Sequence, residues 1–200
     1  MTNDLLARFA PLFEPKSIAV IGASASGITP GNEFIRHSQA FGYTGKIFPI
    51  HPSASTIEGL RCYRSFADIG ETVDYGYIAV GAQHVTRLLN DAAGRLLYAQ
   101  VMSSGFGEIA EGRDREVSVI AAARAGNIRV LGPNCLGVHS PRGGITFVGG
   151  AARERGEIGI VSQSGGLAVD MILRGAARGL RAGLAPVRPV GLRPGGFQGR

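Results

Sequence analysis

Short apolar runs rich in β-branched residues recur along the first 160 residues of the chain, and helix-like segments separate several of them. Six strands are predicted, at Ser17–Ile21, Lys46–Ile50, Tyr75–Val80, Leu97–Met102, Ile128–Leu131 and Glu157–Val161. Two of the intervening helices are clear in the pattern, at His84–Ala93 and Arg113–Ala125. This alternation predicts an α/β protein with a Rossmann-like parallel sheet, in which ligands bind at the carboxyl ends of the strands.

A glycine-rich and proline-containing stretch, residues 140–150, separates the fifth predicted strand from the sixth. We expect it to be a linker or exposed loop that ends a first domain over residues 1–150. Residues 151–179 would then begin a second α/β domain, of which only the start is present. Residues 180–200 lack acidic residues and a strand-like run, so we expect a disordered tail rich in Arg, Gly and Pro.

The net charge of +6 would favour a nucleic-acid partner if it were spread over the chain, but it is not. Six arginines lie in residues 174–200, without Asp, Glu or Lys, so residues 1–173 carry as many acidic as basic residues. No nucleic acid is therefore expected as a partner. The first residues contain charges and lack a long apolar run, which predicts neither a secretory signal nor a membrane span. Cys62 and Cys135 stand alone in the sequence, which indicates a reducing, cytoplasmic location and no zinc site.

Three glycine-containing segments follow predicted strands and are the candidates for chemistry. In the first, Gly22 and Gly27 bracket four small residues directly after the first strand. Small side chains let a backbone approach a phosphate, and a following helix can offer free N–H groups. The spacing matches neither the dinucleotide fingerprint nor the Walker A motif. A tight strand–helix turn without a ligand would have the same sequence.

The second segment, Gly132–Val138, follows the fifth strand, and its Asn134 and Cys135 are candidates to point into the crevice. Gly-Pro-Asn is also ordinary turn chemistry, and a lone Cys often serves as a small apolar residue. In the third segment, Ser162, Ser164, Gly165 and Gly166 stand at the start of a predicted helix. Hydroxyls and bare N–H groups at a helix N-terminus suit an anion, although Ser164 could be a plain N-cap.

Taken together and in this order, the three segments resemble the N-terminal part of the ADP-forming acyl-CoA synthetases, to which the alpha subunit of succinyl-CoA synthetase is related. The resemblance covers about residues 12–179 and includes residues 47–69, 78–82 and 101–108. It implies a CoA-binding first domain, followed by the truncated start of a flavodoxin-like domain. In a complete member, a phosphorylated histidine couples acyl-CoA to acid, CoA and nucleoside triphosphate.

The resemblance also assigns residues to ligands. Those expected to bind CoA are Gly22, Ala23, Ser24, Ala25, Ser26, Gly27, Pro52, Ser53, Ser103, Ser104, Asn134 and Cys135. Those expected to bind the phosphate carried by the histidine are Ser162, Ser164, Gly165 and Gly166. Ser53 stands where the family commonly has a Lys that meets a CoA phosphate, so affinity could be lower unless Lys46 or Arg61 compensates.

The family's catalytic histidine and its nucleotide-binding ATP-grasp portion have no counterpart in these residues, so no catalytic residue is assigned. His37, His51, His84 and His139 do not lie in the matching context and lack metal-ligand spacing. ATP or ADP with magnesium would bind only through the missing domains, in a longer or correctly framed chain or in a complementary ATP-grasp partner. The abrupt end of the resemblance at Gly179 is what a frame shift or truncation would produce.

Two other functions remain open at this stage. Similar domains occur fused to protein acetyltransferases, where they serve as non-catalytic CoA-binding or regulatory modules. An NAD-dependent oxidoreductase is the more distant alternative, because an acidic residue should follow the second strand to hold a ribose, whereas His51 and Pro52 stand there.

Overall fold

A computed structural model describes residues 2–186. Its helices and strands are, in chain order, α1 (Thr2–Phe13), β1 (Ser17–Ile21), α2 (Pro30–Phe41), β2 (Lys46–Ile50), β3 (Thr56–Ile57), β4 (Leu60–Arg61), η1 (Ala67–Ile69), β5 (Val73–Ile78), α3 (Ala82–Asp91), β6 (Leu96–Val101), η2 (Ala110–Gly112), α4 (Arg113–Ala125), β7 (Arg129–Leu131), β8 (Val138–His139), β9 (Ile158–Gly159), α5 (Gly165–Ala176) and β10 (Ala182–Pro186). The predicted strands and helices are present, with the sixth strand shorter than expected.

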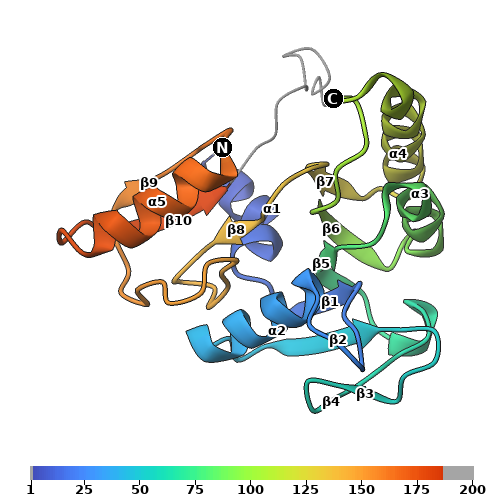
Figure 1. Cartoon of the computed structure of the whole chain (residues 1–200), viewed down its shortest axis with the longest axis horizontal. Helices are drawn as coiled ribbons and strands as arrows, with labels where there is room; N and C mark the ends of the chain where they lie inside the picture. The colour runs from blue at the N-terminus through green and yellow to red at the C-terminus, as the bar shows by residue number, and fades with distance from the viewer. Residues whose placement is uncertain (1, 187–200) are drawn as a thin grey trace.

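A parallel sheet of five strands, in the order β2-β1-β5-β6-β7, forms the centre of the molecule (Figure 1). The strands are buried because helices cover both faces, with α3 and α4 on one side and α1 and α2 on the other (Figure 1). The alternation of side chains along β1 supplies both cores. Ala19 and Ile21 join the cluster under α3 and α4, while Ile18 and Val20 join the cluster under α2. The predicted Rossmann-like fold is confirmed.

The segment after β7 forms a second, smaller layer that Figure 1 shows beside the main sheet. The unit β9–α5–β10 is a βαβ unit, because β9 and β10 pair in parallel. In the same small sheet, β10 pairs antiparallel with β8, which lies before the predicted domain boundary at residue 150. A cut at residue 150 would therefore separate β8 from its partner strand, and that boundary stays a prediction.

The expectation of disorder from residue 180 onward is wrong for residues 182–186, because these form β10. The sequence there has low strand propensity, and it is the pairing with β8 and β9 that holds it extended. The rest of the predicted tail, residues 187–200, lies outside the described residues.

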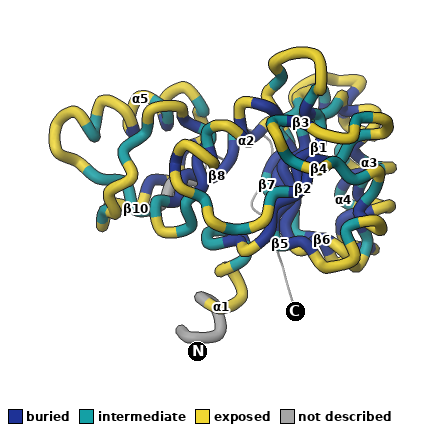
Figure 2. Tube along the Cα trace, turned by 90° about the horizontal axis from the view of Figure 1, so that it is seen from below, coloured by how far each residue is buried: buried dark blue, intermediate teal, exposed yellow. Residues whose placement is uncertain are grey.

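The exposed residues gather on the outer helical surfaces and on the hairpin β3–β4, whereas the inner strands β1, β5 and β6 of the main sheet are largely buried and the edge strands β2 and β7 are partly buried (Figure 2). Within residues 2–186, no helix combines the length and the apolar character needed to cross a membrane.

Candidate functional site

The strand order places a topological switch point between β1 and β5. From β1 the chain passes through α2 to β2 on one side, whereas the following strands β5, β6 and β7 add on the other side. In doubly wound sheets the ligand crevice opens at the carboxyl ends of the two strands that flank this point. The segment after β1, residues 22–29, lies there and is the first of the three segments singled out in the sequence.

Two glycines are required by the way the β1–α2 connection folds. Gly22 has a φ of +101°, and a Cβ built on it would lie 2.2 Å from the carbonyl oxygen of Ala79, at the end of the neighbouring strand. A Cβ on Gly31, in the first turn of α2, would lie 2.6 Å from the amide nitrogen of Ala23. Gly27 differs, because its Cβ would meet only the Ser24 hydroxyl, at 3.9 Å. The fold therefore does not require a glycine at position 27, and the absence of a side chain there leaves the surface of the loop open.

Asn32, a buried residue of α2, holds this loop in place. Its Oδ1 accepts hydrogen bonds from the amides of Ser24 at 2.9 Å and Thr29 at 3.2 Å, and its Nδ2 donates to the Ser24 carbonyl oxygen at 2.9 Å. Thr29 caps the helix, with its hydroxyl oxygen accepting from the Asn32 amide. The loop is thus preorganised by its own helix, which reduces the entropy lost when a ligand binds.

The same hydrogen bonds limit what the loop can offer an anion. Pro30 has no N–H, and the amides of Ser24, Ser26, Thr29 and Asn32 are engaged within the loop and cap. Within the described residues, the amides of Ala25, Gly27 and Ile28 have no acceptor. The expectation of free N–H groups therefore applies to the loop more than to the helix.

A pocket of about 420 Å³ opens beside this loop. Its lining comes from the loop, from α2 and from the hairpin β3–β4, and consists of Ser24, Ala25, Gly27, Ile28, Asn32, Arg36, Thr56, Ile57 and Glu58. Three of the expected cofactor residues, Ser24, Ala25 and Gly27, line it, whereas Ala23 is buried and Ser26 lies exposed beyond it. A volume of this size holds part of a large ligand, within the range usual for small-molecule sites.

Glu58 and Arg36 are the charged residues of the pocket, and sequence reasoning missed both. The Glu58 carboxylate accepts from Asn32 Nδ2 at 2.7 Å through one oxygen and from Arg36 Nε at 2.7 Å through the other. The hydrogen bond from Arg36, followed by the one from Asn32, lowers the pKa of Glu58. Glu58 lies eight residues beyond β2, so no local motif signals that the hairpin folds back onto the loop.

The ends of β5, β6 and β7 are tied together by the second group of expected residues. The Ser103 hydroxyl donates to the Val80 carbonyl oxygen, and the Asn134 amide donates to the Ser103 carbonyl oxygen at 2.9 Å. Ser104 and Asn134 are exposed at this edge of the sheet. The structure thus brings Ser103, Ser104 and Asn134 to the carboxyl edge.

The expectation that Cys135 points into the crevice is wrong. Its side chain is fully buried and packs with Ala168 of α5, and burial raises the pKa of its thiol to about 12. The backbone explains this inward orientation. The Cys135 amide donates to the Val101 carbonyl oxygen at 3.1 Å, and its carbonyl oxygen accepts from the buried Gln100 Nε2 at 2.5 Å. Cys135 is a core residue joining the main sheet to α5.

The turn after β2 carries no acidic residue and no lysine. Pro52 and Ser53 are exposed, and His51 Nδ1 accepts from the amides of Ser53 at 3.3 Å and Ala54 at 2.9 Å. Lys46 cannot compensate for Ser53, because it lies at the amino end of β2 and pairs with Glu71 at 2.8 Å. Arg61 is on the hairpin, with its guanidinium 5.2 Å from the centre of the Tyr63 ring.

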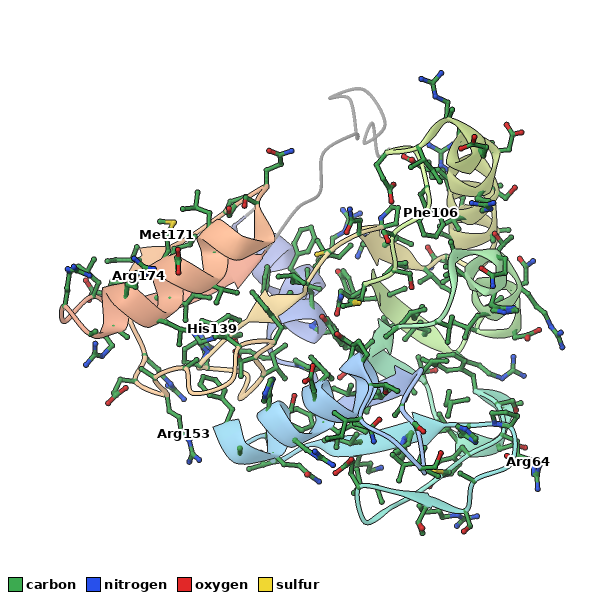
Figure 3. All side chains as sticks on the ribbon, viewed as in Figure 1. Arg64, Phe106, His139, Arg153, Met171 and Arg174 are labelled. Carbon is green, nitrogen blue, oxygen red and sulfur yellow. The ribbon has the colours of Figure 1, made fainter. Side chains whose placement is uncertain are left out.

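Arg64 is a further cation near this turn, donating from Nη1 to the Pro52 carbonyl oxygen at 2.5 Å (Figure 3). The sequence contained no signal for it, because the contact depends on how the chain returns beside β2.

The third segment forms the N-terminus of α5. Ser164 is the N-cap, and its hydroxyl oxygen accepts from the Leu167 amide at 3.3 Å. Ser162 is buried and donates to the Ser164 carbonyl oxygen at 2.8 Å. A Cβ on Gly165 would lie 2.5 Å from Leu136 Cδ1, whereas Gly166 faces open space. The plain capping role of Ser164 is present, and phosphate binding by these four residues stays a prediction.

The four histidines of the chain lie on different elements, His37 in α2, His51 after β2, His84 in α3 and His139 in β8. His139, in β8, is buried in the smaller layer beside Phe41 of α2 (Figure 3), with Nδ1 3.0 Å from the Thr146 hydroxyl oxygen, and burial lowers its pKa to about 4. His84 is exposed on α3. Among residues 2–186, no cluster of three or more His, Cys, Asp or Glu side chains could hold a metal ion.

A doubly wound sheet with a glycine-containing loop and a polar pocket at its switch point is typical of domains that bind a nucleotide-containing ligand. Comparison with known proteins narrows this class. Residues 16–141 match the CoA binding domain family, and the chain belongs to that family.

Curated relatives agree with the resemblance drawn from the three segments. ADP-forming acetate–CoA ligase II of Archaeoglobus fulgidus is 38% identical over 168 residues, which are 80% of this chain and 25% of that protein. The alpha subunit of ADP-forming acetate–CoA ligase I of Pyrococcus furiosus is 34% identical over 168 residues, 80% of this chain and 36% of that subunit. The chain thus spans about a quarter to a third of the length of these relatives.

A solved structure supports the same relationship. The dinucleotide-forming acetyl-coenzyme A synthetase 1 of Ca. Korarchaeum cryptofilum, in complex with phosphate and ADP, superposes with a TM-score of 0.83 at 28% identity. The match covers 90% of this chain and 39% of that one. The similarity to ADP-forming acyl-CoA synthetases is therefore confirmed.

Proposed function

We propose that this chain provides the CoA-binding portion of an ADP-forming acyl-CoA synthetase. CoA binds with a phosphate of its pyrophosphate against the loop of residues 22–29, at the pocket that Ser24 and Gly27 line. The remainder follows the carboxyl edge of the sheet toward Ser104 and Asn134. The observation that carries the proposal is the pocket at the switch point, in a chain whose residues 16–141 match the CoA binding domain family.

The residues present fit such a ligand. The three loop amides without an acceptor, those of Ala25, Gly27 and Ile28, suit phosphate oxygens, and the exposed side chain of Ile28 offers an apolar surface beside them. NAD fits less well. Both oxygens of Glu58, the acidic residue that lines the pocket, are already bonded to Asn32 and Arg36, so neither is directed at a ribose.

The first experiment is calorimetry of the purified chain with CoA, dephospho-CoA and NAD. We expect CoA to bind and NAD to bind more weakly or not at all; equal or tighter binding of NAD would contradict the proposal. Ser24→Trp places a large side chain at the pocket and should abolish CoA binding, with the circular dichroism spectrum unchanged. Val117→Trp, on the exposed face of α4, is the matched control and should bind CoA normally.

We further propose that this chain alone binds CoA without forming a thioester. ADP-forming ligation requires a nucleophile that carries phosphate between nucleotide and acyl group. His139 is buried and His51 is engaged in a turn, which suits neither for that task. The nucleotide site and the phosphohistidine would come from further residues or from a partner chain, as the separate alpha subunit of the P. furiosus relative suggests.

This second proposal is tested with ATP, magnesium, CoA and a panel of short and aromatic acids. No thioester should form above a blank without protein. Turnover that Ser164→Ala abolishes would show that the chemistry lies within these residues.

A further inference from the structure

The ion pair between Arg36 and Glu58 lies at the mouth of the pocket and joins α2 to the hairpin β3–β4. Arg36 donates through Nε at 2.7 Å, so one edge of its guanidinium is used and the two Nη groups have no acceptor within the described residues. The Arg36 side chain is 49% exposed, whereas that of Glu58 is 15% exposed. The free part of the guanidinium therefore faces the pocket opening and solvent.

Glu58 is held firmly enough to fix the direction of Arg36. It occupies the two-residue turn of the hairpin together with Gly59, with φ values of +50° and +75°. Its second oxygen is bonded to Asn32, which in turn holds the loop after β1. Arg36 is thus aligned by a hydrogen-bonded chain that runs from the loop through Asn32 to the hairpin.

Arg36 lies on the side of the pocket where the adenosine ribose of a nucleotide ligand is expected. In doubly wound sheets the pyrophosphate of a dinucleotide binds at the first strand–helix turn, and its adenosine ribose lies toward the end of the second strand. Here the hairpin after β2 closes that side of the pocket, and Arg36 faces it. Arg36 is also the one cation that lines this pocket within the described residues, and Ser53 of the turn after β2 is uncharged.

We propose that Arg36 binds the phosphate on the adenosine ribose of CoA and sets the preference for CoA over dephospho-CoA, with Glu58 as its positioning residue. The inference rests on the proposed CoA-binding function. A guanidinium with free Nη groups suits a phosphate monoester, which carries nearly two negative charges at neutral pH. Charge-assisted bonds of this kind change binding constants by about tenfold to a hundredfold.

The test is calorimetry with CoA, dephospho-CoA and adenosine 3′,5′-bisphosphate. We expect the unaltered chain to prefer CoA over dephospho-CoA by about tenfold or more. Arg36→Gln should weaken CoA and the bisphosphate by a similar factor and leave dephospho-CoA unchanged. Arg87→Gln removes an exposed arginine from α3 and is the control with the same change of charge. It should leave all three affinities unchanged.

Glu58→Gln tests whether Glu58 positions Arg36, independently of the hydrogen bond by which Glu58 contacts Asn32. Glutamine retains an oxygen that can accept from Asn32 but cannot form the ion pair with Arg36. We expect a reduced preference for CoA over dephospho-CoA, with dephospho-CoA binding as in the unaltered chain. An increased preference would mean that Glu58 repels the phosphate and would overturn its positioning role.

The outcomes distinguish the inference from the function on which it rests. If the unaltered chain binds neither CoA nor dephospho-CoA, the proposed function fails and the inference fails with it. If it binds both equally, or if Arg36→Gln weakens both equally with an unchanged melting temperature, CoA binding stands and the assignment of Arg36 to the ribose phosphate is overturned.

Discussion

Replacing Gly22 by alanine should destabilise the fold, because two separate costs fall on one residue. A φ of +101° lies outside the conformations that residues with a Cβ adopt readily, which costs about 1–2 kcal/mol. The new Cβ would also lie 2.2 Å from the Ala79 carbonyl oxygen and 2.6 Å from its carbon, both on backbone. Relieving such a contact requires the ends of β1 and β5 to separate, a strain of about 1–3 kcal/mol.

The two costs together amount to about 2–5 kcal/mol, a large share of the stability of a typical domain. For a chain of this size the melting temperature should fall by about 4–20 °C. The matched control is Gly27→Ala, in the same loop. Its Cβ would meet only the Ser24 hydroxyl, at 3.9 Å, so stability should change by less than about 0.5 kcal/mol.

Urea unfolding, followed by circular dichroism, measures both free energies, and calorimetry with CoA adds the binding side. Gly27→Ala should weaken CoA binding while the protein stays as stable as the unaltered chain, because a methyl group would stand where the ligand approaches. Equal stability of Gly22→Ala and Gly27→Ala would refute the reasoning, since it would mean that the strand ends accommodate the Cβ at no cost.

Three further predictions concern other residues. The pKa of His139 is lowered to about 4 by burial, so the unfolded state binds the additional proton between that value and its ordinary pKa of about 6.5. The contribution of His139 to the free energy of unfolding should therefore be fully present above about pH 6.5 and fall by about 3 kcal/mol as the pH drops to about 4. Urea unfolding at a series of pH values measures this decrease, which should be smaller in His139→Gln. A thiol reagent at pH 8 should label the half-buried Cys62 well before Cys135, whose pKa of about 12 keeps it protonated, and equal rates seen by mass spectrometry would contradict its burial. Ser164→Ala should cost about 1 kcal/mol by removing the cap of α5, with the main sheet unaffected in hydrogen exchange.

The main sheet could be predicted from the sequence because its signals are local. The strand β1 is buried along its whole length, β2 is an apolar run after Lys46, and the predicted bounds of both agree with the structure. The helix α4 was equally well placed. By contrast, β10 and the hairpin β3–β4 were missed. Each is short, and their extended form depends on a partner strand that the sequence does not identify.

Some residues of the candidate pocket could be predicted from the sequence and others could not. The difference again depends on whether the signal is local in the sequence. Ser24 and Gly27 belong to a glycine-bracketed loop that a reader can recognise in isolation. Arg36 and Glu58 are ordinary surface-type residues in the sequence, 22 positions apart, and they acquire a role only when the hairpin folds against α2. The orientation of Cys135 is likewise a tertiary result, because the turn that contains it is compatible with an inward or an outward side chain.

The second segment, although it does not supply a reactive thiol, determines how the predicted phosphate site is held relative to the sheet. The Cys135 amide is bonded to the end of β6 and its side chain packs against Ala168, one helical turn into α5. The next residue, Leu136, fills the space that a Cβ on Gly165 would need. Two independent contacts therefore fix the N-terminus of α5 beside the edge where Ser103 and Asn134 lie. Because both contacts are apolar and close, a substitution at Cys135 should affect any phosphate bound at α5 through displacement of that helix rather than through lost chemistry.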